Sequence, residues 1–232
     1  MSINNETIIY AVLGGLIPAL FWLWFWLRED KKRPEPRGLL FLSFVAGMVM
    51  VPIVIPIQRF FSPNLQNITL LTIFLWALIE EVFKFGASYW AALRRKAMDE
   101  PIDPMIYLIT TALGFAALEN TLFLMNSLSS GFLWESVITG NMRFIGATLL
   151  HTIASGIVGL FMALSFYKSR MVKKISLFAG LVIAILLHTF FNFFIMNTVT
   201  SGVFLIFSAV WMITILLILF FEKVKNIRNI RR

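Results

Sequence analysis

Long apolar runs, separated by short polar connections, dominate the chain. Seven of them hold about 20 residues and are too long and too uniformly apolar to be strands or amphipathic helices of a water-soluble fold. They cover residues 8–27, 39–57, 69–93, 105–126, 143–167, 175–196 and 199–221. Because about 20 helical residues cross the hydrocarbon core of a bilayer, the pattern predicts an all-α, polytopic bundle of about seven transmembrane helices. We expect residues 1–232 to form a single integral membrane domain.

The composition agrees with this prediction and limits the chemistry. Of the 232 residues, 59% are hydrophobic and 14% are charged, against roughly 45–50% and 25% in an ordinary soluble domain. The chain has no Cys, which excludes disulfides, thiolate nucleophiles and Cys-ligated metals, and its two His exclude a three-His metal site. Any reaction must therefore be carried by carboxylates, two imidazoles and few other polar groups.

The positive charge is distributed as in a membrane protein of fixed orientation. Of the 20 Lys and Arg residues, 17 fall in the tail and in the connections that end on the same side of the predicted bundle. By the positive-inside rule that side is cytoplasmic, which places the N-terminus outside and the C-terminus in the cytoplasm. Because these clusters account for the formal net charge of +8, we expect the lipid bilayer, and no nucleic acid, as the partner of this charge.

A small set of polar residues lies inside the apolar runs, where an ionisable group costs about 2.5–3.5 kcal/mol to insert. The ionisable ones are Glu80, Glu81 and Lys84 in the third run, Glu119 in the fourth, His151 in the fifth and His188 in the sixth. Polar neighbours that could support them are Asn120, Arg143 and Asn192. Helical spacing puts each set on one face, and all the sets lie at one depth, between the bilayer centre and the outer face. They therefore predict a single buried polar site shared by four helices.

The residue types in this site favour hydrolysis. Two adjacent buried carboxylates, Glu80 and Glu81, repel each other in a low dielectric, so one of them is able to act as a base toward water at neutral pH. His151 would orient the water or take over its proton, and His188 with Asn192 would stabilise a developing oxyanion. No Asp lies in any run, which argues against a Ser-His-Asp triad. The set predicts a hydrolase that cleaves an amide bond inside the membrane.

Structural interpretations of the same residues stay open. Glu80 and Lys84 could form an ion pair that holds the third run in the bundle, and either histidine could make an interhelical hydrogen bond. Arg143 could reach the lipid headgroups instead of the site. The shared depth of the groups favours a functional site, because stability alone does not require it.

No organic cofactor is predicted, whereas a divalent metal such as zinc stays open. Glu80, Glu119, His151 and His188 together supply enough nitrogen and oxygen ligands for it. The chain has no HExxH motif, the usual zinc-binding signature of a metalloprotease.

Four short motifs in these runs resemble those of the PrsW family of intramembrane proteases. Residues 80–84 read Glu-Glu-Val-Phe-Lys, like its EExxK motif, and residues 115–120 read Phe-Ala-Ala-Leu-Glu-Asn, like FxxxEN. The stretch from Arg143 through His151 to Gly156 is similar to the histidine-bearing third motif, and residues 188–192 match HxxxN. The motifs keep the family's order, so the resemblance covers about residues 69–196, the expected catalytic core.

The resemblance implies a membrane peptidase of glutamic or metal-dependent type, in a superfamily that includes the CAAX prenyl proteases. It also implies a membrane-anchored protein substrate, such as an anti-sigma factor, in a prokaryotic cell (inner) membrane. Carried onto the matching positions, Glu80, Glu81, Glu119, His151 and His188 would form the catalytic site. CAAX-type relatives have His where this chain has Glu119, so their residue roles do not transfer unchanged.

Two other functions remain open on the sequence. A proton-coupled transporter would also need Glu, His and Lys along a polar path, but the inverted repeat common in transporters is not found. A non-catalytic scaffold subunit would keep the polar site for assembly. We expect instead an intramembrane endopeptidase that cleaves near the outer half of the bilayer, and the sequence sets no oligomeric state.

Overall fold

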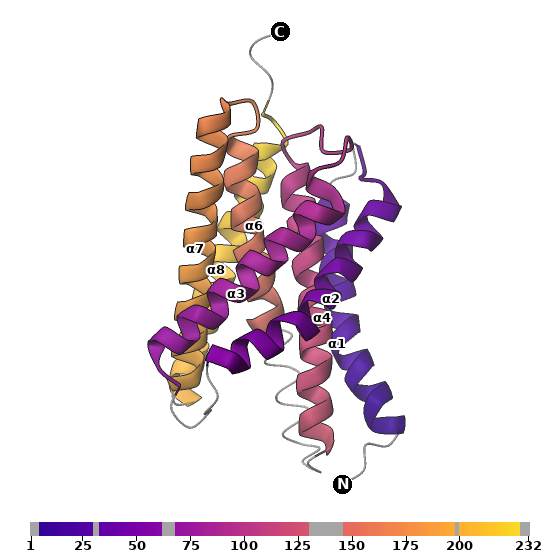
Figure 1. Ribbon diagram of the computed structural model, residues 1–232, viewed down its shortest axis with the longest axis vertical. Helices are drawn as coiled ribbons and strands as arrows, with labels where there is room; N and C mark the ends of the chain where they lie inside the picture. The colour runs from indigo at the N-terminus through magenta and orange to yellow at the C-terminus, as the bar shows by residue number, and fades with distance from the viewer. Residues whose placement is uncertain (1–4, 30–32, 62–67, 130–145, 198–199, 228–232) are drawn as a thin grey trace.

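The computed structural model describes residues 5–29, 33–61, 68–129, 146–197 and 200–227. Within these ranges the chain is helical and contains no strand (Figure 1), as the apolar runs predict. The α-helices, in chain order, are α1 Asn5–Glu29, α2 Arg37–Phe61, α3 Leu70–Ser88, α4 Asp103–Ser129, α6 Thr148–Leu164, α7 Arg170–Asn197 and α8 Thr200–Val224. Each coincides with one predicted run, and the bounds differ by a few residues.

The third run is not one regular helix. After Ser88 the backbone widens into a π-helical turn, η1 Tyr89–Leu93. The Arg94 N–H donates to the carbonyl of Tyr89, five residues earlier, at 3.3 Å. Hydropathy does not distinguish an α-helix from a π-helix, because both bury the same apolar side chains, so this turn is not predictable from the apolar pattern.

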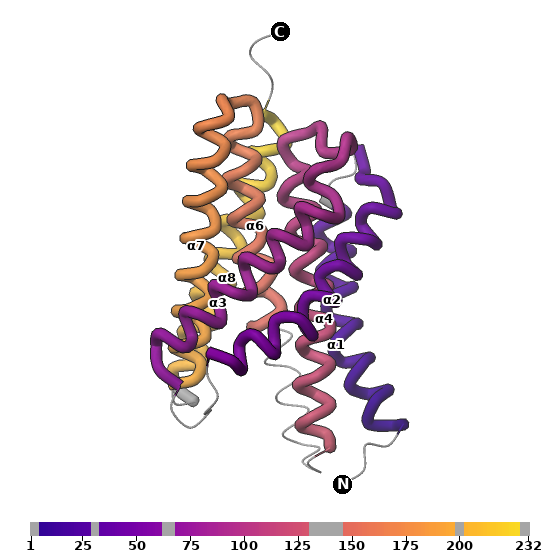
Figure 2. Tube along the Cα trace, in the orientation of Figure 1, coloured from indigo at the N-terminus to yellow at the C-terminus, as the bar shows by residue number. Residues whose placement is uncertain are grey.

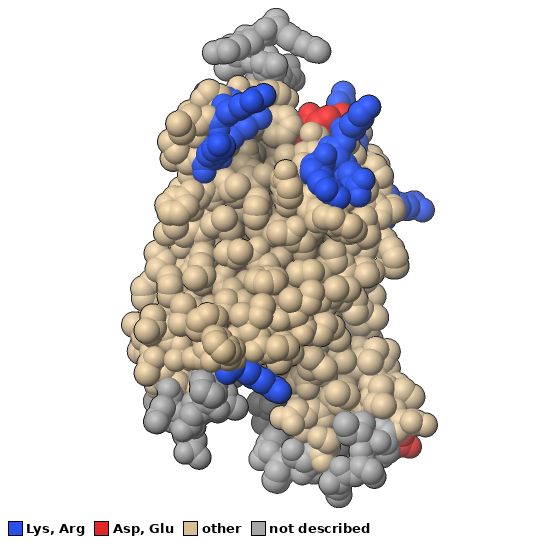
Figure 3. Space-filling view, in the orientation of Figure 1, with Lys and Arg blue, Asp and Glu red and all other residues tan. Residues whose placement is uncertain are grey.

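Five of the described helices are long and apolar enough to cross a membrane: α1, α2, α4, α7 and α8. The chain is therefore an integral membrane protein. Of the other two, α6 is an apolar helix of 17 residues and α3 carries the three ionisable residues of the third run. The count of about seven spans and the orientation of the termini stay predictions. On the face shown in Figure 3, basic side chains concentrate at the upper end of the molecule, in keeping with a cytoplasmic side there.

Helix α4 forms the centre of the bundle, and α1, α2 and α6 pack around it. Its first four turns are buried throughout, from Asp103 to Ala117. Two glycines let α2 cross α4 at backbone contact. A Cβ on Gly47 would lie 1.9 Å from the carbonyl oxygen of Thr111, and a Cβ on Gly114 would lie 1.9 Å from that of Phe44. Any larger residue would push the two helices apart.

Helix α3 crosses the bundle obliquely and contacts α2, α4, α6 and α7 (Figure 2). It is the element that brings the polar positions of four predicted runs to one place. Helix α8 packs mainly on α6 and has little contact with α7, and it is the least buried of the candidate spans. The polar centre of the molecule therefore lies between α3, α4, α6 and α7, while α8 lies at the edge.

Candidate active site

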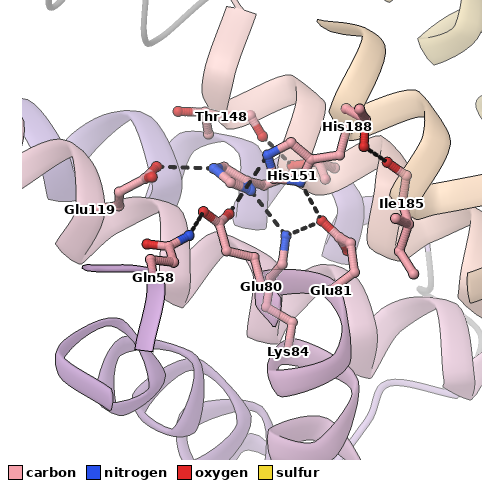
Figure 4. Close-up of polar contacts among 11 residues, drawn as sticks. Gln58, Glu80, Glu81, Lys84, Glu119, Thr148, His151, Ile185 and His188 are labelled. Atoms are coloured by element: carbon pink, nitrogen blue, oxygen red, sulfur yellow. Dashed lines mark hydrogen bonds and ion pairs between the residues drawn. The ribbon is translucent and has the colours of Figure 1, made fainter. Parts of the chain in front are cut away.

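The ionisable residues of the predicted site meet where α3 crosses α4, α6 and α7 (Figure 4). Glu80, Glu81 and Lys84 come from α3, Glu119 from α4, His151 from α6 and His188 from α7. All are buried except Glu119, whose side chain is 20% exposed. The three residues of α3 can point the same way because helical positions three and four apart share a face. The structure thus brings together all six groups that the sequence places at one depth.

Glu81 is held from two sides. The same oxygen, Oε1, lies 2.5 Å from Lys84 Nζ and 2.7 Å from His188 Nδ1. A carboxylate paired with an ammonium group accepts hydrogen bonds only, so His188 must carry its proton on Nδ1 and donate it. In the neutral imidazole, His188 Nε2 then carries the lone pair. Glu81 therefore fixes both the orientation and the tautomer of His188.

His151 lies between Lys84 and Glu119. Lys84 Nζ is 3.0 Å from His151 Nδ1, and His151 Nε2 is 3.0 Å from Glu119 Oε2. Because an ammonium group can only donate, Nδ1 accepts and Nε2 carries the hydrogen that is donated to Glu119. The two imidazole rings meet edge to face, with their centroids 5.1 Å apart. Lys84 thus links the Glu81–His188 pair to the His151–Glu119 pair.

Glu80 has different surroundings from its sequence neighbour. Its Oε1 accepts a hydrogen bond of 2.8 Å from Gln58 Nε2 of α2. Its Oε2 is buried, has no hydrogen-bond partner among the described residues, and lies 3.6 Å from His188 Nε2. The backbone at Gln58 is itself held in place, since the main-chain carbonyl oxygen of Gln58 accepts a hydrogen bond from Trp76 Nε1 at 3.3 Å. One oxygen of Glu80 is therefore fixed, and the other is free to bind.

A cavity of about 540 Å³ opens beside these groups. Its polar wall comprises Gln58, Arg59, Glu80, Glu119, His151, His188 and Asn192. Glu81 and Lys84 do not line it, although they are in contact with residues that do. Arg59 is exposed, and the remaining lining is apolar, with aromatic rings from α3, α4, α7 and α8. A peptide segment could therefore contact Glu80, Glu119 and both histidines at once.

Two of the predicted supporting residues, Asn192 and Asn120, lie among the described residues. Asn192 lines the cavity. Asn120 does not; its Nδ2 donates to Thr148 Oγ1 at 2.9 Å and so ties α4 to α6. Arg143 lies outside the described residues. Gln58 was missed by the sequence analysis, although a lone amide near the end of the second apolar run was a usable signal.

The residues present fit a divalent metal. Glu80, His151 and His188 can each offer one ligand atom, and these atoms lie within 4.8 Å of one another. Glu80 Oε2 and His188 Nε2 lie 3.6 Å apart and suit this role, and Glu81, which is hydrogen-bonded to His188 Nδ1, would be the usual carboxylate partner of a metal-bound histidine. His151 would have to release Lys84 or Glu119 to become the third ligand. Glu119, which the sequence offered as a further ligand, is not in this group.

Comparison with known proteins extends the resemblance beyond the four motifs. The family described as "PrsW family intramembrane metalloprotease" matches residues 35–220. The Protease PrsW of Oceanobacillus iheyensis is 28% identical over 183 residues, which are 78% of this chain and 80% of the relative. The Protease PrsW of Shouchella clausii is 23% identical over 220 residues, or 94% and 97% of the two chains. That of Bacillus subtilis is 24% identical over 188 residues, or 80% and 83%. No solved structure matches the chain.

Proposed function

The chain belongs to the PrsW family of intramembrane proteases and is a peptidase, and we propose that it hydrolyses a peptide bond of a membrane-anchored protein inside the cavity beside Glu80. The predicted topology puts this cavity in the outer half of the bilayer. The scissile bond then lies near the extracytoplasmic face of a prokaryotic cell membrane. An anti-sigma factor or another regulated single-pass protein would present a bond at that depth.

The observation that carries the proposal is the free oxygen of Glu80. Glu80 lines the cavity together with His188, and its Oε2 is buried and has no hydrogen-bond partner among the described residues. A water molecule within reach of Glu80 Oε2 and His188 Nε2 would meet two proton acceptors. Glu80 then takes the proton while the water oxygen attacks the peptide carbonyl. Glu81 is proposed as a positioning residue, because it does not line the cavity itself and fixes the orientation of His188, which does.

The later steps need a proton donor and an oxyanion partner. Asn192 lines the cavity and is proposed to donate its amide N–H to the carbonyl oxygen as charge develops there. Glu80, which now carries the proton of the water, is proposed to pass it to the amine nitrogen as the C–N bond breaks, and this returns Glu80 to its carboxylate form. Glu119 lines the same cavity and is hydrogen-bonded to His151, so this pair is proposed to orient the reacting segment.

A divalent metal would use the same residues. Glu80, His151 and His188 would hold it, and it would supply Lewis-acid polarisation of a bound water or carbonyl. The other roles are the same with or without a metal. Glu119 and Asn192 line the cavity in both cases, and Glu81 orients His188.

The test is a comparison of new protein N-termini in membranes and medium from cells that make the wild type, Glu80→Gln or Glu81→Gln at equal levels. We expect termini in or just outside a membrane span only in the wild type. Glu6→Gln, an exposed glutamate at the start of α1, is the matched control and should behave as the wild type. Identical termini in the wild type and both site variants, with all proteins present in the membrane, would contradict the proposal and favour a scaffold subunit.

A further inference from the structure

A second hollow of the molecule lies next to the site and is lined by apolar side chains, several of them exposed. It is an apolar groove of about 360 Å³ between α6, α7 and α8. None of its described lining residues is ionisable; Phe190 and Phe194 line it from α7, and Gly202, Leu205 and Ala209 line it from α8. The rings of Phe190 and Phe194 stack with their centroids 6.5 Å apart. The groove therefore offers a flat aromatic wall and a wall with two small residues.

The groove adjoins the catalytic cavity, and two buried side chains form the wall between them. Leu150 and Phe191 line both hollows. Leu150 directly precedes His151, and Phe191 lies one helical turn after His188. The ring of Phe191 also stacks on Phe207, which lines the catalytic cavity from α8. A substrate segment that crosses from the groove between Leu150 and Phe191 would arrive beside the two histidines.

Helix α8 has little contact with α7, and apolar side chains along the groove are exposed. The contact between the two helices is sparse, and Leu205 in the groove wall is 75% exposed. In lipid, helices associate through close packing instead of the hydrophobic effect, and small residues allow that packing. Gly202 and Ala209 lie seven positions apart, which puts them on the same face of α8.

Another apolar groove, between α2 and α3, does not adjoin the catalytic cavity in this way. It has a volume of about 500 Å³ and is lined by Val82, Gly86 and Trp90 among others. None of its described lining residues lines the catalytic cavity. A helix bound there would be separated from Glu80 by α3 itself.

We propose that the membrane-spanning helix of the protein substrate docks in the groove between α6, α7 and α8, and that its scissile segment passes between Leu150 and Phe191 to reach the cavity. The inference deepens the proposed function and rests on it. It assigns this peptidase a substrate that enters sideways from the bilayer, with its recognition helix still in lipid. A lipid chain in the same groove is the competing occupant.

The absence of cysteine from the chain makes a reversible block possible. Ala209→Cys places a thiol in the groove, and benzyl methanethiosulfonate then fills it. Ser208→Cys is the matched control, because Ser208 is the preceding exposed residue of α8 and does not line the groove. Two probes are compared: the anchored substrate found by the N-terminus comparison, and a soluble peptide that spans its scissile bond.

We expect the label on Ala209→Cys to slow cleavage of the anchored substrate by about tenfold or more, as for a misplaced reacting segment. Cleavage of the soluble peptide should be unchanged, a reductant should restore the activity, and labelled Ser208→Cys should cleave normally. Unchanged cleavage of the anchored substrate by labelled Ala209→Cys overturns the inference, including when the label displaces bound lipid. Equal inhibition of both probes overturns it as well. Failure of the unlabelled variants and of the wild type to cleave either probe would instead count against the proposed function.

Discussion

At the scale of single residues, the site divides into groups that line the cavity and groups that hold them. Glu80, Glu119 and His188 line it, whereas Glu81 and Lys84 lie behind His188 and His151. Adjacent carboxylates on one helix thus have different partners. A carboxylate whose oxygen is fixed by two donors is suited to orienting a base or ligand, and one with a free oxygen is suited to binding water.

Gln58 is the residue that keeps Glu80 in place, so its loss should act through Glu80. We expect Gln58→Leu, which removes the 2.8 Å hydrogen bond but keeps the volume, to lower kcat about 10–100-fold with KM little changed, because a hydrogen bond to a charged acceptor contributes about 1.5–3 kcal/mol. Steady-state kinetics on the anchored substrate measure both constants. Asn197→Leu is the control, since this exposed amide donates to Phe193 O within α7 and does not line the cavity. A rise in KM at unchanged kcat would show that Gln58 binds substrate instead.

The buried pair Glu81–Lys84 should be costly to break from one side. We expect Lys84→Met to lower the free energy of unfolding by about 3–5 kcal/mol, because it leaves a carboxylate buried without its cation. The double variant Glu81→Gln/Lys84→Met should recover most of this loss, as measured by thermal unfolding in detergent. The pair Glu222–Lys225 has the same spacing and the same 2.5 Å distance but is exposed, so Lys225→Met should cost under about 1 kcal/mol. Equal effects of the two Lys→Met changes would refute the argument.

At the scale of elements, the sequence predicts the helices well because a bilayer demands long apolar runs. It also predicts that the polar groups meet, because six ionisable residues in lipid must find partners. The sequence does not predict the different roles of Glu80 and Glu81, since the partners that distinguish these residues come from α2 and α7. The hydrogen bond from Asn120 to Thr148 and the π-helical turn were beyond it as well, because both depend on how neighbouring helices pack and not on the local pattern.

The crossing of α2 and α4 sets the position of Gln58, which makes the glycines at the crossing testable. We expect Gly114→Ala to destabilise the protein by about 1–3 kcal/mol, because its Cβ would lie 1.9 Å from the Phe44 carbonyl oxygen. Gly86→Ala is the control: no atom lies within 4 Å of its Cβ position, and alanine favours the helix. Thermal unfolding in detergent compares the two. A loss of stability in Gly86→Ala as large as that in Gly114→Ala would contradict the packing argument.

At the scale of the whole molecule, the site joins three helices through residues that are far apart in the chain. Glu80 is on α3, His151 on α6 and His188 on α7. A metal bound by these residues would therefore clamp the bundle and stabilise the folded state by mass action. The alternative is a site in which hydrogen bonds alone hold the three helices together.

Zinc binding distinguishes these two forms of the site. We expect zinc at about 100 times its Kd to stabilise the purified protein by about 2.7 kcal/mol, seen as a higher Tm, with about one equivalent bound by elemental analysis. Glu80→Gln and His188→Ala should lose both effects. Glu222→Gln, an exposed carboxylate outside the site, should keep them. A wild-type protein that binds no zinc and cleaves normally in the presence of a chelator would assign the reaction to Glu80 and the histidines alone.

The orientation of the bundle decides which face of the membrane the substrate is cut near. Glu6 lies at the start of α1, the end at which the predicted topology is outside, and Lys96 follows η1 at the predicted cytoplasmic end. Because the chain has no native cysteine, Glu6→Cys and Lys96→Cys each carry one thiol. We expect a membrane-impermeant maleimide to label Glu6→Cys in intact cells and Lys96→Cys only after permeabilisation, since the connections rich in Lys and Arg stay inside. The opposite pattern would turn the cavity toward the cytoplasmic half of the bilayer, and the substrate would then be a protein cut near its cytoplasmic side.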